Sequence, residues 1–558
     1  MKIRLFLLLT FLSVFAFSCK TDNSKQEVSQ ITEIRQWKPE DTRSITGVSA
    51  KKGLLTKTDK ATPGYVLFQP SSSTKTYLMD MDGKIVHTWQ SELSSLHSYL
   101  LENGHLFRLE RDVDFPTFAA GGQAGRIREY DWDGNMLWDF EYANANELTH
   151  HDFEIMPNGN ILAISYEVKT LEEAAAAGRN PELTAKAGIW PDKIIEIKPI
   201  RPNGGEIVWE WHMWDHLIQD FDPAKNNYGV LADHPRKINI NLEGGEGGPE
   251  MTEEQIKQMI QMGFMTSNAT PENQGSDISH FNAISYNADL DQIVVSCPSY
   301  SEVYIIDHST TTEEAKGSTG GKWGHGGDLL YRWGNAQNYG RGTKEDQKLY
   351  GQHDIKFISK GLPGEGHLMV FDNDIVNPDN KMPSVWAALM AAQSPDPQVS
   401  IADLGNYSAV YEFVPPTDKN GAYIIPDSGS IGPEESVWKY MASDKYSLYS
   451  AFVSGAHRMK NGNTFVTEGA TGRFIEVTPD GETVWEYMNP YNDNYKLPDG
   501  TVAQPTGPFL YAQFRGTHFD LDFPAFNGKD LKPVEPQPEP FVFKMPPPPP
   551  TQENDSIH

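Results

Sequence analysis

One pattern recurs along the chain and limits what it can fold into. Five segments share a glycine, a spacer, two mostly aliphatic residues, an aromatic residue or histidine, another spacer and a final aromatic residue. They are GKIVHTW ending at Trp89, GNMLWDF at Phe140, GEIVWEW at Trp211, GDLLYRW at Trp333 and GETVWEY at Tyr487. A sixth, YSAVYEF ending at Phe413, lacks only the glycine. Several follow a strand pattern and a DG turn, which indicates a β-hairpin.

Each aromatic segment is followed, after a variable loop, by a segment that opens with a histidine. These histidines are His97, His151, His280, His353, His457 and His518. Several of these segments continue into an NG turn and a further strand, so the repeating unit has four strands, the first with a histidine and the last with an aromatic residue. Six such units predict an all-β fold, a six-bladed β-propeller. The 62 aromatic residues (13 Trp, 23 Tyr, 26 Phe), 47 glycines and 38 prolines fit many short strands joined by turns.

The two ends of the repeat region predict how the ring closes. His518 opens a unit that has no room to finish, while the chain begins with three strands, GYVLFQ, TYLMDMD and KIVHTW, that lack a histidine strand. We expect these to form one blade, which leaves no open sheet edge. The propeller should span residues 61–530, with helical insertions at about 168–188 and 212–275.

The first 18 residues read as a secretion signal, with a basic start and a short apolar stretch. Their ending, FAFSC, resembles a bacterial lipobox, which implies lipidation of Cys19 and a tether over residues 19–60. We therefore expect an exported protein that is lipid-anchored to a bacterial membrane, at the periplasm or cell surface. Cys297 is then the one remaining thiol, so no internal disulfide can form. The proline-rich segment 531–558 is expected to be an extended or disordered spacer.

The net charge of −29 is spread along the chain, which argues against nucleic acid as a partner. Contact with a membrane is expected through the lipid anchor alone.

Histidines at one repeat position suggest a shared site. The first strand of each propeller blade lines the central channel, so six equivalent histidines would point several imidazoles at one axis. For any single histidine, a hydrogen bond to a neighbouring loop is the simpler interpretation. Six histidines at the same repeat position are not expected by chance, so the set as a whole favours a shared site.

Five motifs carry a resemblance to a known family. GQHDIKF followed by HLMVFDN, together with HHDFEIMPNGN, HFNAISYNADLDQIVVS and NGNTFVTEG, is similar to the PAPS-independent aryl-sulfate sulfotransferases, which are bacterial six-bladed propellers. The resemblance implies a transferase that moves a sulfuryl group from an aryl sulfate donor to a phenolic acceptor through a sulfated histidine, without a cofactor. It implies that His353 is the nucleophile and that His151, His280 and Asn282 surround the sulfuryl group. For His150 a loop role is expected, because His151 is the histidine followed directly by Asp, as His353 is.

The sequence departs from that family at one place. An arginine is expected after the strand that follows the HxN motif, but the chain has Cys297 and Pro298 there. Arg458 and Arg515 are the candidates to replace it, and His457 and His97 complete the expected substrate-binding set.

The residue types themselves agree with this chemistry. Neutral imidazole is a nucleophile near neutral pH, since its ordinary pKa is about 6.5. A covalent intermediate divides one difficult transfer into two easier ones. Phenolates leave more readily than alkoxides, so aryl sulfates are the expected donors. By strand alternation Asp152 and Asp354 should point away from the channel and brace the blades.

Other interpretations remain. His212 and His216 could form part of a metal site, but no third ligand motif follows and a structural role is favoured. A bound structural calcium ion is a further alternative, although no motif specifies one. A formylglycine sulfatase is disfavoured because Tyr300 stands where that signature needs arginine. The alternative function is a non-catalytic surface propeller that binds sulfated aromatic or glycan ligands.

Overall fold

A computed structural model of the protein describes residues 51–71, 73–112, 117–242, 252–254, 256–257, 268–375, 406–443, 447–496, 502–503 and 510–542. The secretion signal, the lipidation of Cys19 and the last part of the proline-rich tail, residues 543–558, lie outside these ranges. None of the helices within them is long and apolar enough to span a bilayer.

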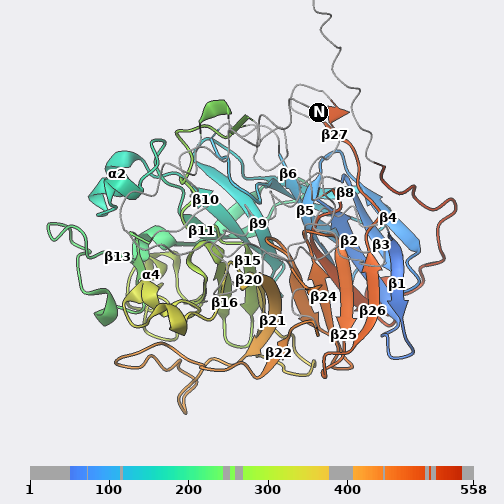
Figure 1. Ribbon diagram of the computed structural model, residues 1–558. Helices are drawn as coiled ribbons and strands as arrows, with labels where there is room; N and C mark the ends of the chain where they lie inside the picture. Colours follow the sequence, from blue (N-terminus) through green and yellow to red (C-terminus); the bar gives the residue numbers. More distant parts are fainter. Residues whose placement is uncertain are drawn as a thin grey trace, which may run out of the picture. The chain divides into compact units, whose positions relative to one another are not determined.

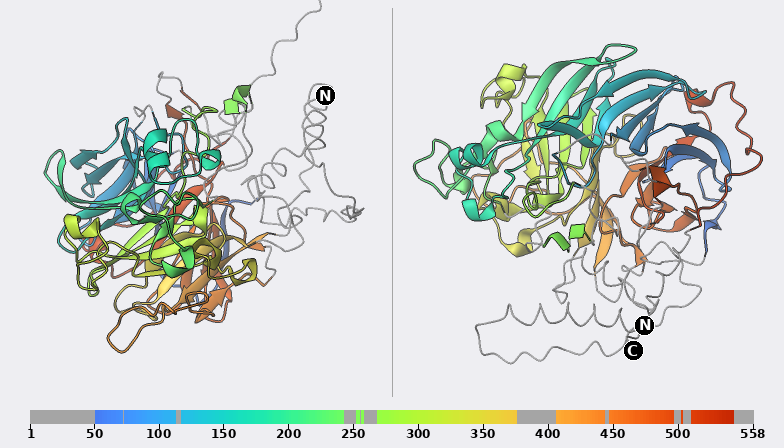
Figure 2. Two further views of the ribbon diagram at one scale, coloured as in Figure 1. Left: turned by 90° about the vertical axis from the view of Figure 1, so that its left-hand side faces the viewer. Right: turned by 90° about the horizontal axis from the view of Figure 1, so that it is seen from above.

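The fold is the predicted six-bladed β-propeller, and its sheets follow one another around a ring (Figure 1; Figure 2, right). Blade 1 contains β29 (Gln513–Asp520), β2 (Gly64–Pro70), β3 (Lys75–Asp80) and β4 (Ile85–Gln90). Blade 2 contains β5 (Ser95–Leu100), β6 (Leu106–Arg111), β7 (Gly125–Tyr130) and β8 (Met136–Glu141). Blade 3 contains β9 (Glu147–Ile155), β10 (Ile161–Glu167), β11 (Asp192–Pro199) and β12 (Gly205–His212).

The other three blades follow the same order. Blade 4 contains β15 (Ala283–Asn287), β16 (Gln292–Cys297), β17 (Glu302–Asp307) and β18 (Tyr331–Trp333). Blade 5 contains β19 (His353–Phe357), β20 (Leu368–Ile375), β21 (Tyr407–Phe413) and β22 (Trp438–Tyr440). Blade 6 contains β23 (Gly455–Arg458), β24 (Thr464–Glu468), β25 (Arg473–Val477), β26 (Thr483–Met488) and β1 (Gly53–Lys57).

The ring closes as predicted, because β29 from the end of the chain pairs with β2 near its start, with Tyr65 opposite Phe519. Two details differ from the sequence prediction. Strand β1, placed in the expected tether, pairs with β26 as a fifth strand. The segment YSAVYEF is the third strand of blade 5, and the fourth is β22, which follows a long connection.

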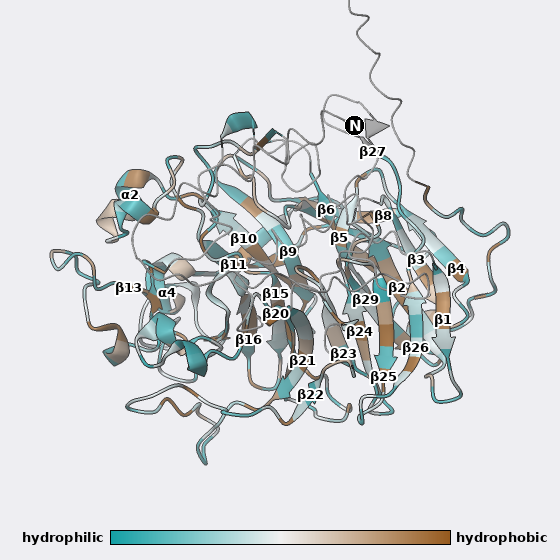
Figure 3. Cartoon of the chain, viewed as in Figure 1, coloured by the Kyte–Doolittle hydropathy of each residue, from teal (hydrophilic) through white to brown (hydrophobic). Residues whose placement is uncertain are grey.

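The first strands of the six blades contact one another in a closed cycle, β5, β9, β15, β19, β23 and β29, and so surround the axis. A cluster of buried apolar residues lies at each of the six interfaces between neighbouring blades. Side chains alternate along a strand, so Val66 of β2 packs into the cluster shared with blade 6 and Leu67 into the cluster shared with blade 2. Figure 3 shows polar and apolar stretches alternating along the strands. Both faces of each sheet are therefore buried.

A tryptophan from the fourth strand of each blade forms a hydrogen bond to the next blade. Each indole Nε1–H donates to a backbone carbonyl before the fourth strand of the next blade. The pairs are Trp89 to Asp131, Trp138 to Gly204, Trp211 to Gly327, Trp333 to Pro433, Trp438 to Pro479 and Trp485 to Met81. The last pair crosses the closure point, at 2.9 Å. Five of the six tryptophans, all but Trp438, belong to the aromatic repeat, which therefore links neighbouring blades.

The described parts of the two insertions contain short helical stretches, as the sequence predicts. The first contains one short helix, α2 (Leu171–Ala176), capped by Thr170, and a 3-10 turn. The described part of the second has 3-10 turns, the two-residue strands β13 (Leu217–Ile218) and β14 (Ile238–Asn239), and helical residues at 253–254 and 256–257. Most of its MTEEQIKQMIQMGF stretch lies outside the described residues. The remaining elements are α4 (Thr312–Ala315), β27 (Tyr495–Lys496) and β28 (Val502–Ala503).

The first part of the expected spacer is packed against the propeller. Val534 N–H donates to Ile85 O and Phe541 N–H donates to Pro490 O, both at 2.9 Å. The sequence predicts an extended or disordered spacer; residues 531–542 lie along the propeller, because these backbone groups find partners on blades 1 and 6.

Candidate active site

Three of the six histidines gather around the axis. His151, His280 and His353 come from blades 3, 4 and 5 and are between 3% and 8% exposed. The rings of His151 and His280 meet edge to face with centroids 4.4 Å apart. His280 is also close enough to His353 to lower its pKa electrostatically. These are the histidines that the family resemblance named.

The backbone turns these side chains inward at irregular points of the strands. His150, His151 and Asp152 lie opposite the single residue Ile164, because the pairing of β9 with β10 shifts there. His151 and His280 have left-handed φ values of 55° and 58°. For a residue other than glycine such a conformation costs about 1–2 kcal/mol, and such strain clusters at functional sites.

His353 is held in one tautomer. The amide nitrogen of Asn373 donates to the carbonyls of Ser450 and Val453, at 2.8 and 2.9 Å, so its Oδ1 is the atom that faces His353. That oxygen lies 2.8 Å from His353 Nδ1, which must therefore carry the hydrogen. The lone pair is on Nε2, where it accepts a 3.1 Å hydrogen bond from Val453 N–H.

Burial lowers the pKa of His353 to about 3, against the opposing effect of the Asn373 hydrogen bond. Since asparagine is neutral, it orients the ring without the charge that would favour an imidazolium. His353 is thus a neutral imidazole over a wide pH range, with its hydrogen on Nδ1 and its lone pair on Nε2.

His151 is bonded through a second histidine to a carboxylate. Its Nδ1 lies 2.7 Å from Nδ1 of His150, whose Nε2 lies 2.8 Å from Oδ1 of Asp192. His150 stacks on the ring of Tyr166 at 3.6 Å. His150 is fully buried within β9, so the expected loop role is wrong. Burial lowers the pKa of His151 well below its usual range, and the neighbouring histidines add to this effect.

His280 has a carboxylate as its direct partner. Its Nδ1 lies 2.5 Å from Oδ2 of Asp277, which also accepts the hydroxyl of Tyr166 at 2.9 Å. The three histidines thus differ in what holds them: a neutral amide, a histidine backed by a carboxylate, and a carboxylate. Sequence reasoning missed Asp192, Asp277 and Asn373; only the last stood in a quoted motif, HLMVFDN.

Arg515 of blade 1 lies beside this cluster. Its Nη1 is 2.7 Å from Asp152 and its Nε is 2.9 Å from Asp354, while Nη2 donates to Asn282 O at 3.2 Å. Burial alone would lower the pKa of Arg515, but the two carboxylates outweigh it and the pKa is raised. Of the two candidates for the missing family arginine, this is the one near the site, although its charge is already paired.

Asp152 and Asp354 join neighbouring blades. Asp152 accepts from Ile284 N–H of blade 4 at 3.2 Å, and Asp354 accepts from Ala456 N–H of blade 6 at 2.9 Å. The bracing role is confirmed. The expectation that they point away from the site is wrong, since both contact Arg515. Alternation fails because the strands bulge there: Asp354, with φ 57°, and Ile355 lie opposite the single Val370.

Asn282 is fully buried and its amide donates to Gln352 O at 2.9 Å, beside His353. Its Oδ1 has no hydrogen-bond partner among the described residues. Its predicted contact with a sulfuryl group stays a prediction.

The other histidines are not at equivalent positions. His457 Nε2 accepts the backbone N–H of His518 at 3.2 Å, and burial with the nearby Lys356 lowers the pKa of His457. Burial lowers the pKa of His518 to about 4. His97 packs edge to face on Tyr99, with Arg515 close by. The six histidines therefore do not form one ring.

Arg458 points away from the site. Its guanidinium pairs with Glu412 and lies 4.8 Å over Trp438, between blades 5 and 6. It is on the opposite side of β23 from His457, as alternation requires. The structure gives Arg458 a packing role, so its assignment as a substrate ligand is corrected.

The remaining candidates are structural. Cys297 is buried with Sγ 3.2 Å from Ser279 O, and burial raises the pKa of its thiol well above the usual range. His216 is bonded to Asp328 and Ala315 O, at 2.8 Å each, whereas His212 pairs with Glu167 at 3.2 Å. No group of three metal-binding side chains is found in the part of the chain that the structure describes.

The sequence matches the arylsulfotransferase (ASST) family over residues 51–496, most of the chain. The chain belongs to this family. None of the curated proteins matches it. Among solved structures, a protein of unknown function from Bacteroides caccae is 12% identical, with a TM-score of 0.36, covering 76% of this chain and 94% of that one. Virginiamycin B lyase from Staphylococcus aureus is 9% identical, with a TM-score of 0.32, covering 79% and 89%. At these scores neither likeness supports an argument about this arylsulfotransferase-family chain.

Proposed function

We propose that this family member moves a sulfuryl group from an aryl sulfate to a phenol through a covalent intermediate on Nε2 of His353. The observation that carries the proposal is the fixed tautomer of His353. Asn373 holds the hydrogen on Nδ1 at 2.8 Å, which leaves the nucleophilic lone pair on Nε2 inside the ring of blades.

The reaction has two balanced halves. In the first, His353 Nε2 attacks sulfur, an N–S bond forms, and the S–O bond to the donor phenol breaks with its electron pair leaving on oxygen. In the second, the acceptor phenol attacks sulfur and the N–S electron pair returns to Nε2. Because the aryl sulfate supplies the sulfuryl group, neither half needs PAPS. Sulfuryl transfer should resemble phosphoryl transfer, in which alignment and donors to the equatorial oxygens dominate catalysis.

Val453 N–H bears on the first step. It bonds Nε2 of His353 at 3.1 Å in the free protein, and Val453 has a left-handed φ of 53°. Attack on sulfur requires Nε2 to give up this bond. The freed N–H is then placed to donate to a sulfuryl oxygen. Asp277 fixes the ring of the neighbouring His280 through Nδ1.

One observation favours the alternative of a non-catalytic binding propeller. Arg515, the guanidinium beside the histidines, is already paired with two carboxylates and is less available to bind the sulfuryl charge. The two functions differ in turnover: a binding module would hold the ester unchanged, and replacement of His353 would leave its affinity intact.

The test is transfer from 4-nitrophenyl sulfate to phenol in a reaction without PAPS. We expect nitrophenolate release that depends on the acceptor, ping-pong kinetics, and a loss of about 10⁴-fold or more in His353→Gln, by analogy with removal of other nucleophiles. Arg458→Met is the matched control and should retain transfer. Binding of the ester without release, unchanged in His353→Gln, would favour the binding module.

We further propose that the protein acts at a membrane surface through lipidated Cys19. A fatty-acyl label should be incorporated by the full-length precursor and lost in Cys19→Ser. Equal labelling of both forms would exclude this anchor.

A further inference from the structure

Acid catalysis by His151 poses a physical difficulty. A departing phenolate needs a proton, and His151, which contacts His280 in the central cluster, has no hydrogen bond at Nε2 within the described ranges. Burial lowers the pKa of His151 well below its usual range, and the nearby Arg515 and histidines lower it further. An isolated imidazolium is therefore disfavoured at this position.

The partner of His151 removes the difficulty. Nδ1 of His150 lies 2.7 Å from Nδ1 of His151, so one hydrogen is shared between two ring nitrogens. His150 Nε2 and Asp192 Oδ1 face each other at an ion-pair distance of 2.8 Å, and neither atom has a hydrogen-bond partner among the described residues. Oδ2 of Asp192 accepts from Ser279 Oγ at 2.5 Å and from Phe281 N–H at 2.8 Å. These donors solvate a carboxylate that is fully buried.

We propose that Asp192 and His150 are positioning residues that form a proton relay with His151 and serve the leaving and attacking phenols. This inference rests on the proposed function and deepens it. In the loaded state His150 is an imidazolium paired with Asp192, its Nδ1–H donates to His151 Nδ1, and His151 is neutral with its hydrogen on Nε2.

The relay balances over the two half-reactions. As the S–O bond of the donor breaks, His151 Nε2 gives its proton to the phenol oxygen while His150 Nδ1–H passes to His151 Nδ1. His150 then keeps its hydrogen on Nε2, facing Asp192. When the acceptor phenol attacks, its proton goes to His151 Nε2 and the Nδ1 proton returns to His150. His151 never carries a full positive charge.

The fold keeps the relay in line. The His150 ring stacks on Tyr166 with an angle of 10° between the planes, which opposes rotation out of the hydrogen bonds. The hydroxyl of the same tyrosine bonds to Asp277, the partner of His280. On the other side, Gly122 packs directly against His151: a Cβ there would lie 2.1 Å from Nε2.

Dependence on the leaving group tests the relay. We expect His150→Gln and Asp192→Asn to slow formation of sulfo-His353 from phenyl sulfate by about 100-fold or more, the usual range of general-acid catalysis. With 4-nitrophenyl sulfate, whose leaving group is a far weaker base, the loss should be under about fivefold. His216→Gln is the matched control, because His216 is a buried histidine paired with Asp328 at 2.8 Å outside the site.

The possible outcomes separate the two proposals. Equal losses with both esters, or no loss, would overturn the relay while leaving the nucleophile intact. A wild-type protein that transfers no sulfuryl group would overturn both. A measurement on the wild type alone removes the risk of misfolded variants: the rate with phenyl sulfate in mixtures of H₂O and D₂O should show two protons in motion. A single proton would contradict the relay.

Discussion

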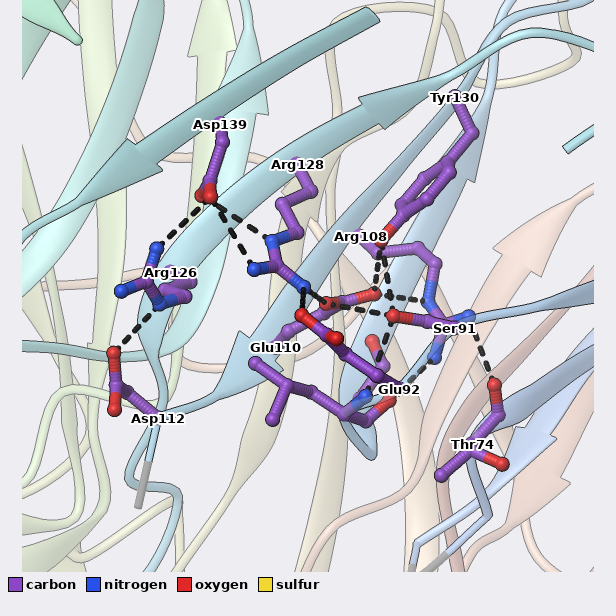
Figure 4. Close-up of polar contacts among 12 residues, drawn as sticks. Thr74, Ser91, Glu92, Arg108, Glu110, Asp112, Arg126, Arg128, Tyr130 and Asp139 are labelled. Atoms are coloured by element: carbon purple, nitrogen blue, oxygen red, sulfur yellow. Dashed lines mark hydrogen bonds and ion pairs between the residues drawn. The ribbon is translucent and has the colours of Figure 1, made fainter. Parts of the chain in front are cut away.

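The central site and blade 2 both bury charged and titratable side chains, but they neutralise them differently. In blade 2, Arg108, Arg126 and Arg128 interleave with carboxylates (Figure 4). Arg108 and Glu110 are fully buried and 3.0 Å apart, and Glu110 also receives Arg128, Tyr130 and Ser91. Each charge there has opposite charges around it.

In the central site the histidines are held in fixed orientations, but they are not each surrounded by opposite charges as the groups of blade 2 are. His353 is held by a neutral amide, and its pKa of about 3 leaves it uncharged. Among the residues that the structure describes, His151 has a hydrogen-bond partner at Nδ1 and none at Nε2. The comparison teaches that buried polarity by itself does not indicate function. What distinguishes the site is His353, whose Nε2 lone pair has a fixed direction and whose partner, Asn373, is neutral and so keeps the imidazole nucleophilic.

The largest effect should come from breaking the blade 2 network. Arg108→Met leaves Glu110 buried with less compensation, so the free energy of unfolding should fall by about 3–5 kcal/mol. Sulfuryl transfer per folded molecule should not change. Chemical denaturation, with rates normalised to folded protein, checks both. A lower normalised rate would mean that the two regions are coupled.

Acid should lower the free energy of unfolding through His518. Burial lowers the pKa of His518 from 6.5 to about 4, so between these pH values the unfolded chain binds a proton that the folded chain does not. Stability therefore falls as pH drops through this window. His518→Gln should reduce the loss of unfolding free energy between pH 7 and pH 4 by about 3 kcal/mol. Arg108→Met should keep the wild-type acid sensitivity; an unchanged pH dependence in His518→Gln would contradict this explanation.

Gly122 gives a sharper test of orientation. Gly122→Ala would place a methyl group against His151 and should slow transfer from phenyl sulfate by about 100-fold. Gly134 is the control, since its φ is also positive, 85°, but its added Cβ meets open space. Gly134→Ala should lower stability by about 1–2 kcal/mol while leaving the rate within about twofold. Similar rates in the two variants would show that the position of His151 does not matter.

The smallest effect concerns the charge of the partner of His353. In Asn373→Asp a carboxylate would favour the imidazolium and raise the pKa of His353 above its value of about 3. Sulfation should then be about tenfold slower at pH 5 than at pH 8, whereas the wild-type rate of this step is flat there. Parallel pH profiles for the two proteins would argue that the neutrality of Asn373 is not used.

The fold could be predicted because each blade has a recognisable local sequence pattern. The aromatic strands, the DG turns and the unpaired strand at His518 are local signals, and together they gave blade number and closure. The fourth strand of blade 5 was missed because Trp438–Tyr440 is short and follows a long connection. Strand β1 was missed because its pairing with β26 joins residues more than four hundred positions apart.

The site was predictable only in its central residues. Motif resemblance named His151, His280 and His353, but no sequence pattern links His150 on β9 to Asp192, which begins β11 on the far side of β10 in blade 3. Strand alternation misplaced Asp152 and Asp354, because it assumes regular pairing and these strands bulge at that point. Equal spacing likewise could not reveal that His457 and His518 pair with each other.

The most direct test of the account is to find the sulfuryl group on His353. Protein mixed with 4-nitrophenyl sulfate and no acceptor should gain one acid-labile sulfuryl group, and peptide mass spectrometry under neutral conditions should place it on His353. The adduct should disappear on addition of phenol and never form in His353→Gln. Turnover without any adduct, or an adduct on another residue that persists in His353→Gln, would contradict the account.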